Sequence, residues 1–176
     1  KLLTCPHPAL GLVLLEETKL LQGLLPQLAP LLGLRQTKHH HLDAWEHTLE
    51  VVQAAGNTPL LRWAALLHDV GKPETRTVDE QGHVHFYGHD EVGAAMAEHI
   101  LTGLRFDNGF VRQVSRLVGL HMRVTRYQSD WHKPALRRLV RGAGDLWQPL
   151  INLSLADAAG HHPDRRQELQ DRILEC

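Results

Sequence analysis

The feature that most constrains the fold is an apolar run that ends in two ionisable residues. Residues 59–67 read PLLRWAALL and predict a helix that is apolar nearly all round, so it should be buried. His68 and Asp69 follow at once, and burying an unpaired carboxylate is costly. A divalent cation would remove that cost, because imidazole and carboxylate are both metal ligands. The alternative is an aspartate that caps backbone amides beside a hydrogen-bonded core histidine.

The rest of the chain predicts an all-α fold. Leucine is abundant and aromatic residues make up only 5% of the chain, which favours helices over a sandwich or barrel. Leucines between residues 8 and 34, interrupted by Pro26 and Pro30, predict two short helices. Asp43 and Glu46 form a capping-box pattern for a helix that runs to about Ala55. Residues 59–71 give the next helix, and further helices are expected at about 90–104, 108–122, 133–141, 146–159 and 165–176. Residues 74–87 alternate and predict a small β-hairpin or an irregular loop.

Length and composition limit the classes of protein. The chain has 176 residues without an internal repeat, so residues 1–176 are expected to form a single domain. Cys5 and Cys176 lie at opposite ends, which suits a reducing, cytoplasmic setting. No apolar stretch of about 18 residues or signal peptide is visible, so no membrane partner is expected. The first residue is Lys1, and the chain could be one module of a longer protein.

The net charge is −1 with histidine neutral, which excludes a polycation built to coat duplex DNA. Between Arg105 and Arg141, however, nine Lys or Arg residues face two acidic ones. This basic stretch could lie beside a phosphate-bearing ligand, or it could form ordinary solvated helix faces.

Four residues can supply one metal site. His47 lies on the predicted helix before the His68-Asp69 pair, and antiparallel helices with a short connection would bring His47 close to His68. Asp157 is a charged residue in a small and apolar helical stretch. Two imidazoles and two carboxylates suit Mn, Fe, Ni, Co or Zn, and spacing alone cannot choose among these ions.

Two further histidines could complete a second site. His89 begins one predicted helix and His121 ends another. With Asp69 as a bridge, His89 and His121 could hold a second cation. Two such ions would clamp a phosphate and activate a water molecule for attack on phosphorus.

The order H…HD…H…H…D, with HDVGKP around the first pair, resembles the HD phosphohydrolase superfamily. The resemblance is closer still to the HD domain of bacterial CCA-adding tRNA nucleotidyltransferases, and a related module is fused to polynucleotide kinase in bacterial end-healing enzymes. It covers residues from about Pro8 to Asp157 and rests on segments such as WEHTLEVV, LRWAALLHDVGKPET, HFYGHDEVGAAMAEHIL and LSLADA.

This resemblance implies an HD-domain helical bundle that hydrolyses 2′,3′-cyclic phosphates and 2′-phosphates with one or two transition-metal ions. Carried over to this chain, the main ligands are His47, His68, Asp69 and Asp157, and the ligands of a second ion are His89 and His121. Many two-metal relatives have a His-His pair where this chain has Leu120-His121. The Gly-Tyr-Pro signature of relatives that hydrolyse cyclic-di-GMP is absent, which argues against that substrate.

The sequence therefore predicts a metal-dependent phosphodiesterase or phosphatase whose substrate is an RNA end or a nucleotide. The alternatives are a noncatalytic HD arm that positions tRNA in a nucleotidyltransferase, and a free-nucleotide phosphatase. A fused kinase or nucleotidyltransferase module would have to lie elsewhere, because this chain has no Gly-rich phosphate loop.

Several charged residues near the motifs are candidates for substrate contacts. Lys72 could act in catalysis with Asp69 by reaching a nonbridging phosphate oxygen, or it could be a solvated cation near a helix end. Arg123 and Arg126 could contact phosphate or an RNA backbone. His85 and Tyr87 could line the pocket, although packing explains them equally well, and His40 and His41 could face the substrate. Four other histidines are expected at the surface without a role: His99, His132, His161 and His162.

Overall fold

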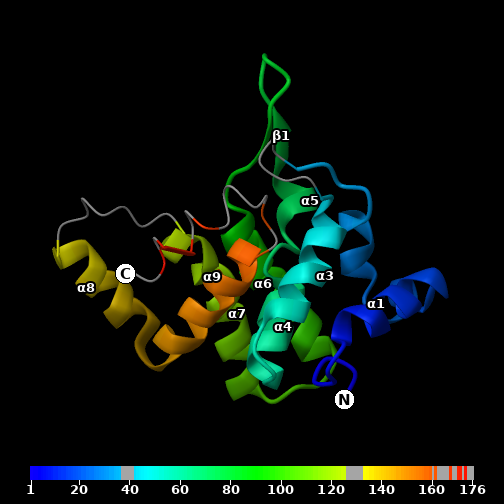
Figure 1. Ribbon diagram of the computed structural model, residues 1–176, viewed down its shortest axis with the longest axis horizontal. Coiled ribbons are helices and arrows are strands. Elements are labelled where there is room, and N and C mark those ends of the chain that lie inside the picture. The colour runs from blue at the N-terminus through cyan, green and yellow to red at the C-terminus, as the bar shows by residue number, and fades with distance from the viewer. Residues whose placement is uncertain are drawn as a thin grey trace.

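The computed structural model describes residues 1–36, 42–125 and 133–159, together with residues 161, 167, 170, 171 and 173. Helices dominate this part of the chain, and one two-stranded sheet accompanies them (Figure 1). The predicted all-α bundle with a small hairpin after the HD segment is therefore confirmed. The α-helices are α1 (Pro8–Glu17), α2 (Leu20–Leu24), α3 (Ala44–Ala54), α4 (Pro59–Leu67), α5 (Lys72–Thr75), α6 (His89–Gly103), α7 (Asn108–Thr125), α8 (Lys133–Ala143) and α9 (Trp147–Ala159).

Helices α3, α4, α6, α7 and α9 surround the core. Helix α7 packs against α6, α4 and α9, and α3 packs against α4 and α9. Figure 1 shows α1 and α8 at opposite ends of this body. The core consists of aliphatic side chains that are almost completely buried, including Val51, Leu66, Leu117, Leu150 and Leu153. No helix within the described ranges combines the length and the apolar character that a membrane span requires.

Local caps set the ends of the helices that carry the motif. The Asp43 carboxylate accepts a hydrogen bond from Glu46 N at 2.8 Å, and Glu46 accepts one from Asp43 N at 2.9 Å, so the predicted capping box is present. Thr58 caps α4 by accepting a hydrogen bond from Leu61 N at 3.3 Å. These caps fix where α3 and α4 begin, and therefore where His47 and His68 lie.

The apolar helix ends earlier than the sequence predicts. Helix α4 stops at Leu67, and residues 68–71 form a turn that leads into the short helix α5. Pro73 lies in the first turn of α5, where its missing N–H has no cost, rather than ending α4. His68 and Asp69 therefore lie in this turn and not within a regular helix.

Helix α6 begins immediately against this turn. A Cβ built on Gly71 would lie 2.4 Å from His89 O and 2.6 Å from Gly93 N. Gly71 has an ordinary φ of −81°, so glycine is needed here for space and not for backbone conformation. Gly93 is similarly crowded, with Val118 Cγ1 3.3 Å from its Cβ position. Small residues thus let the turn, α6 and α7 approach closely.

The hairpin predicted between residues 74 and 87 is also present. Strand β1 (Arg76–Val78) pairs with β2 (Val84–Phe86) in antiparallel register, with Arg76 opposite Phe86. Figure 1 shows that the hairpin projects from the helical body beside α5.

The amino-terminal segment differs slightly from its prediction. In place of two short helices, the chain forms α1, α2 and a 3-10 helix, η1 (Pro26–Leu31), which contains Pro30. A second 3-10 helix, η2 (Gly144–Leu146), precedes α9. Most of the helix predicted from Arg165 onward, and the residues His40, His41, Arg126, His132 and His162, lie outside the described residues.

Candidate metal centre

Six predicted ligands, which come from five separate parts of the chain, lie close together at one buried site. His47 lies within α3, the His68-Asp69 pair follows α4, His89 begins α6, His121 lies near the end of α7, and Asp157 lies near the end of α9. The exposed fraction of these residues ranges from 1% to 6%. Buried imidazoles and carboxylates at this density need one another or a cation as partners.

His47, His68 and the two aspartates form the first donor group. His47 Nε2 lies 3.0 Å from Asp157 Oδ1, and His68 Nε2 lies 3.1 Å from Asp69 Oδ2. The two imidazole Nε2 atoms are 3.3 Å apart. Both imidazoles and both carboxylates therefore direct a ligand atom toward the same small volume.

Asp69 links this group to a second one. Its Oδ2 faces His47 and His68, whereas its Oδ1 lies 3.5 Å from His89 Nε2. His89 Nε2 in turn lies 3.3 Å from His121 Nε2. Since the ligand atoms of Asp69, His89 and His121 all lie within 4.8 Å of one another, this trio could hold an ion beside the first group.

Backbone carbonyl groups fix the tautomers of three histidines. His68 Nδ1 donates to Ala65 O at 2.8 Å in the first donor group. In the second group, His89 Nδ1 donates to Phe86 O at 2.7 Å and His121 Nδ1 donates to Val118 O at 2.6 Å. A carbonyl oxygen can only accept, so each Nδ1 carries a hydrogen. In the neutral ring, Nε2 then presents its lone pair to the centre. This arrangement is typical of histidines that bind a metal through Nε2.

The tautomers of His89 and His121 indicate that their contact needs a cation. Two neutral rings with these tautomers would direct lone pairs at each other across 3.3 Å, which is repulsive. A cation between them, either a proton or a metal ion, removes the repulsion. Burial, together with the charges of His68 and His89, lowers the pKa of His121 to about 4, so an added proton is disfavoured on that ring.

The carboxylates are held in the ionised form that a metal requires. Burial would raise the pKa of Asp69, but the charges of His68 and Lys72 outweigh it and hold the pKa well below its ordinary value. Burial of Asp157 is likewise outweighed by its hydrogen bond from His47 and by the charge of His68, so its pKa is also lowered. Burial would lower the pKa of His68, but Asp69 and Asp157 together outweigh it and raise the pKa, so a metal ion would displace a proton from this ring.

Lys72 is buried in the same cluster. Its Nζ lies 2.6 Å from Asp69 Oδ2 and donates to Gln36 Oε1. The contact between Lys72 and Asp69 is an ion pair. Within the described structure, Asp69 Oδ2 accepts no hydrogen bond of acceptable geometry. A buried carboxylate oxygen without a hydrogen bond is an atom that a metal ion would satisfy. The alternative of a solvated Lys72 does not agree with its 7% exposure.

Other residues singled out in the sequence lie elsewhere. Arg123 is exposed near the end of α7, and the position of Arg126 falls outside the described residues. His85 Nε2 lies 3.0 Å from Asp79 Oδ2 and its ring stacks on exposed Tyr87, so both contribute to the hairpin and belong to neither donor group. His99 is exposed on α6, as expected.

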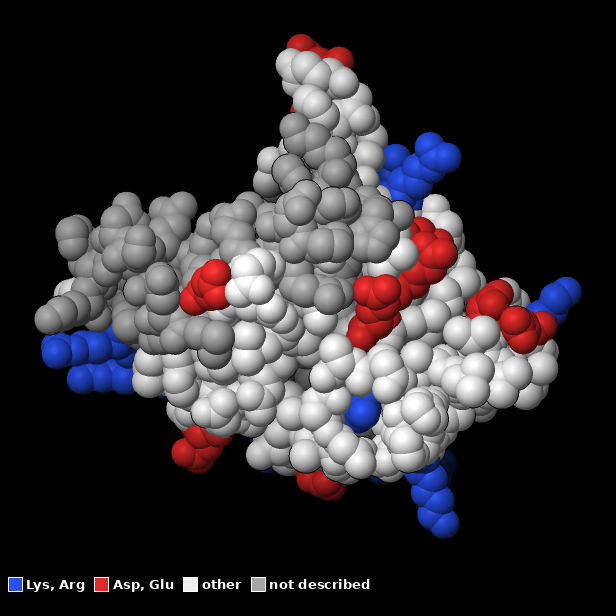
Figure 2. All heavy atoms as spheres, in the orientation of Figure 1, with Lys and Arg blue, Asp and Glu red and all other residues white. Residues whose placement is uncertain are grey.

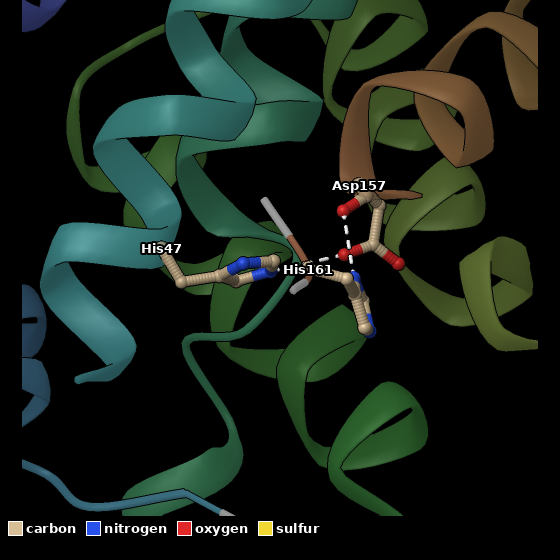
Figure 3. A group of neighbouring side chains, drawn as sticks. All are labelled: His47, Asp157 and His161. Atoms are coloured by element: carbon tan, nitrogen blue, oxygen red, sulfur yellow. Dashed lines mark hydrogen bonds and ion pairs between the residues drawn. The ribbon is translucent and has the colours of Figure 1, made fainter. Parts of the chain in front are cut away.

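His161 is the residue that sequence reasoning missed. It was expected at the surface, but it is half-buried beside Asp157 and His47, and these three residues form a further donor group (Figure 3). Its position four residues after Asp157 could have indicated this closeness, because residues four apart share one face of a helix.

Comparison with known proteins agrees with this geometry. The family described as HD domain matches residues 37–174, which is most of the chain. The chain belongs to the HD domain family. Members of this family have the fold of metal-dependent hydrolases and bind divalent ions, and the His and Asp groups of this chain could hold such ions. A second match, described as a probable RNA and SrmB-binding site of polymerase A, covers residues 1–32.

The most similar relatives include tRNA nucleotidyltransferases. A CC-adding tRNA nucleotidyltransferase of Thermus thermophilus is 46% identical over 163 residues, which cover 89% of this chain and 37% of the relative. An A-adding tRNA nucleotidyltransferase of Deinococcus radiodurans is 41% identical over 162 residues, covering 89% of this chain and 36% of the relative. A multifunctional CCA protein of Azoarcus is 40% identical over 104 residues, covering 56% of the chain and 24% of the relative. This HD chain thus spans just over a third of the length of the first two relatives.

Proposed function

We propose that this HD domain is a metal-dependent phosphohydrolase that acts on 2′,3′-cyclic phosphates and phosphates at RNA ends or on nucleotides. The observation that carries the proposal is the buried convergence of six ligand side chains, with the facing Nε2 atoms of His89 and His121 3.3 Å apart. The ligands proposed for the first ion are His47, His68, Asp69 and Asp157, and those for a second ion are Asp69, His89 and His121.

A bound divalent transition-metal ion would supply Lewis acidity toward phosphate oxygens and would lower the pKa of a water molecule. The chain's own residues set the geometry of that chemistry. Asp69 directs one oxygen to each donor group, so it can tie the two groups to a common substrate position. Backbone carbonyls hold the rings of His68 and His89 in orientation.

Lys72 is proposed to neutralise a nonbridging phosphate oxygen. Its ammonium already lies 2.6 Å from Asp69 and is held by Gln36. When a metal ion satisfies Asp69, Lys72 Nζ becomes available to an anion bound beside that ion. A fixed positive charge aimed at developing negative charge stabilises a transition state.

The test uses the full 176-residue chain, stripped of metal and reloaded separately with Mn, Ni, Co, Zn or Fe(II). Substrates are 2′,3′-cyclic AMP, an RNA oligonucleotide with a 2′,3′-cyclic end, a 2′-phosphate and a DNA 3′-phosphate. We expect ring opening or phosphate release with a transition metal, and loss of turnover in Asp69→Asn, with His99→Gln as the control. A folded, metal-loaded chain that hydrolyses none of these substrates would refute the proposal.

The second candidate is a noncatalytic arm that positions tRNA for a nucleotidyltransferase module outside this chain. It is supported by the names of the relatives, by the match of residues 1–32, and by a basic surface. Arg137, Arg138 and Arg141 are exposed on α8, which carries no acidic residue, and Figure 2 shows Lys and Arg side chains projecting at that end of the molecule.

RNA binding separates the two candidates. Reversal of these three arginines to Glu should weaken tRNA binding and reduce its salt dependence, because fewer phosphates are neutralised. If the chain is a noncatalytic arm that positions tRNA, RNA binds through α8 but no substrate is turned over. Preference for a mononucleotide over an RNA end would instead favour a free-nucleotide phosphatase.

A further inference from the structure

We propose that His161 is an additional metal ligand on the Asp157 side of the centre, and that it biases the site toward borderline ions such as Ni²⁺, Co²⁺ and Zn²⁺. This inference rests on the proposed metal site and names a residue that the motif H…HD…H…H…D does not contain.

The position of His161 is the first observation. It follows α9 by two residues, and its Nδ1 donates to Asp157 O at 3.0 Å. Figure 3 shows its ring beside the Asp157 carboxylate, with His47 of α3 pointing toward both. The hydrogen bond to the main chain of a ligand residue holds the ring at the edge of the donor group.

The spacing of ligand atoms is the second observation. One ring nitrogen of His161 lies within 4.8 Å of both a His47 nitrogen and an Asp157 oxygen. Neighbouring ligand atoms around an ion with bonds of about 2.1 Å are about 3.0–3.4 Å apart, so side-chain movements of about 1–2 Å bring all three into one coordination sphere.

The ring contacts are the third observation. His161 meets His47 edge to face at 5.6 Å between ring centroids, much as His47 meets His68 at 5.3 Å and His68 meets His121 at 5.4 Å. His161 thus extends the row of imidazoles by one member. It is the most exposed member of that row.

The chemical consequence concerns the choice of metal. Without His161, the first donor group has two imidazoles and two carboxylates. With it, nitrogen donors outnumber oxygen donors, which favours Ni²⁺, Co²⁺ or Zn²⁺ over the harder Mn²⁺ and Mg²⁺. The proposal therefore makes a prediction about affinity that needs no turnover.

The test is calorimetric titration of the metal-stripped full chain with Ni²⁺ and, separately, with Mn²⁺. We expect His161→Gln to weaken Ni²⁺ binding by about tenfold or more and Mn²⁺ binding distinctly less. His99→Gln, which removes an exposed imidazole from α6, should bind both ions like the parent protein. If His161 only packs against the end of α9, His161→Gln lowers the melting temperature and leaves Ni²⁺ affinity unchanged, which overturns the proposal.

A second variant tests direct coordination. His161→Cys places a thiol at the same position, and a thiolate is also a ligand for Co²⁺ and Zn²⁺. With Co²⁺ we expect a new near-ultraviolet charge-transfer band, absent from His161→Gln and His99→Cys. A Co²⁺-loaded His161→Cys protein without that band contradicts the assignment.

Failures of the two proposals are distinguishable. If the parent chain binds no ion, the proposed function and this inference fail together. If the parent chain binds Ni²⁺ and hydrolyses substrate while His161→Gln retains full affinity, only the role of His161 is refuted.

Discussion

Replacing Gly71 by alanine should destabilise the protein and disturb the second donor group. The added Cβ would lie 2.4 Å from His89 O and 2.6 Å from Gly93 N, whereas ordinary contact begins at 3.4 Å. Both obstacles are backbone atoms of α6, so they cannot rotate away as a side chain would. The turn and α6 must therefore separate by about 1 Å.

The cost of this separation can be estimated. Overpacking in a well-packed interior costs about 1–3 kcal/mol, and the backbone contacts place Gly71→Ala near 3 kcal/mol. For a domain of this size, that loss lowers the melting temperature by about 6–12 °C. Because the shift begins at His89, the distance between His89 and Asp69 also grows, and affinity for a second ion should fall.

The assay is thermal unfolding of the metal-stripped protein, followed by metal titration. Gly142→Ala is the matched control, because nothing lies within 4 Å of its Cβ position and it is inside α8. It should be neutral or stabilising by about 0.5–1 kcal/mol, since alanine suits a helix better than glycine. A Gly71→Ala protein that melts within about 2 °C of the parent would refute the packing argument.

Three further predictions concern the site. Lys72→Met should reduce turnover about 100-fold while metal still binds, because it removes the charge proposed to face phosphate and a metal ion can replace Lys72 as the partner of Asp69; equal loss of metal affinity would contradict this role. An ion present at 100 times its dissociation constant should raise the melting temperature by about 5–11 °C, and chelation should reverse it, whereas Asp157→Asn should show no such shift. In the metal-stripped protein, His121 has a pKa of about 4, below its unfolded value near 6.5, so the unfolded state binds the extra proton. The contribution of neutral His121 to the free energy of unfolding is present above pH 6.5 and is lost as the pH falls toward 4. The loss is on the order of 3 kcal/mol. The stability of His121→Gln should therefore fall less than that of the parent protein between pH 6.5 and pH 4.

The sequence predicts the helices well, and the residues that it proposes as the main ligands lie close together in the structure. Asp43 and Pro59 mark helix starts through local chemistry, and the His68-Asp69 pair is conspicuous because it ends an apolar helix. The turn at residues 68–71 was less predictable. Its shape depends on the approach of α6 to Gly71, a contact between segments about 20 residues apart that no local pattern encodes.

The partners of charged residues could be predicted only in part. Lys72 was expected near phosphate, but its ion pair with Asp69 and its hydrogen bond to Gln36 depend on tertiary structure. Arg62 is buried on α4 and donates to Val52 O, although an arginine in an apolar helix gives no indication of its partner. His161 required knowledge of how α9 ends and which way the following residues turn.

The spread of the donors along the chain has a consequence for folding. His47 and Asp157 contact each other although they are 110 positions apart in the sequence, so an ion bound by both would act as a cross-link between distant segments. Such a cross-link is absent from the unfolded chain, where the donors are far apart, and its free energy is added to that of the native state. Loading with metal should therefore slow the transient detachment of α9 from α3, and protease cleavage near the end of α9 reports that opening directly.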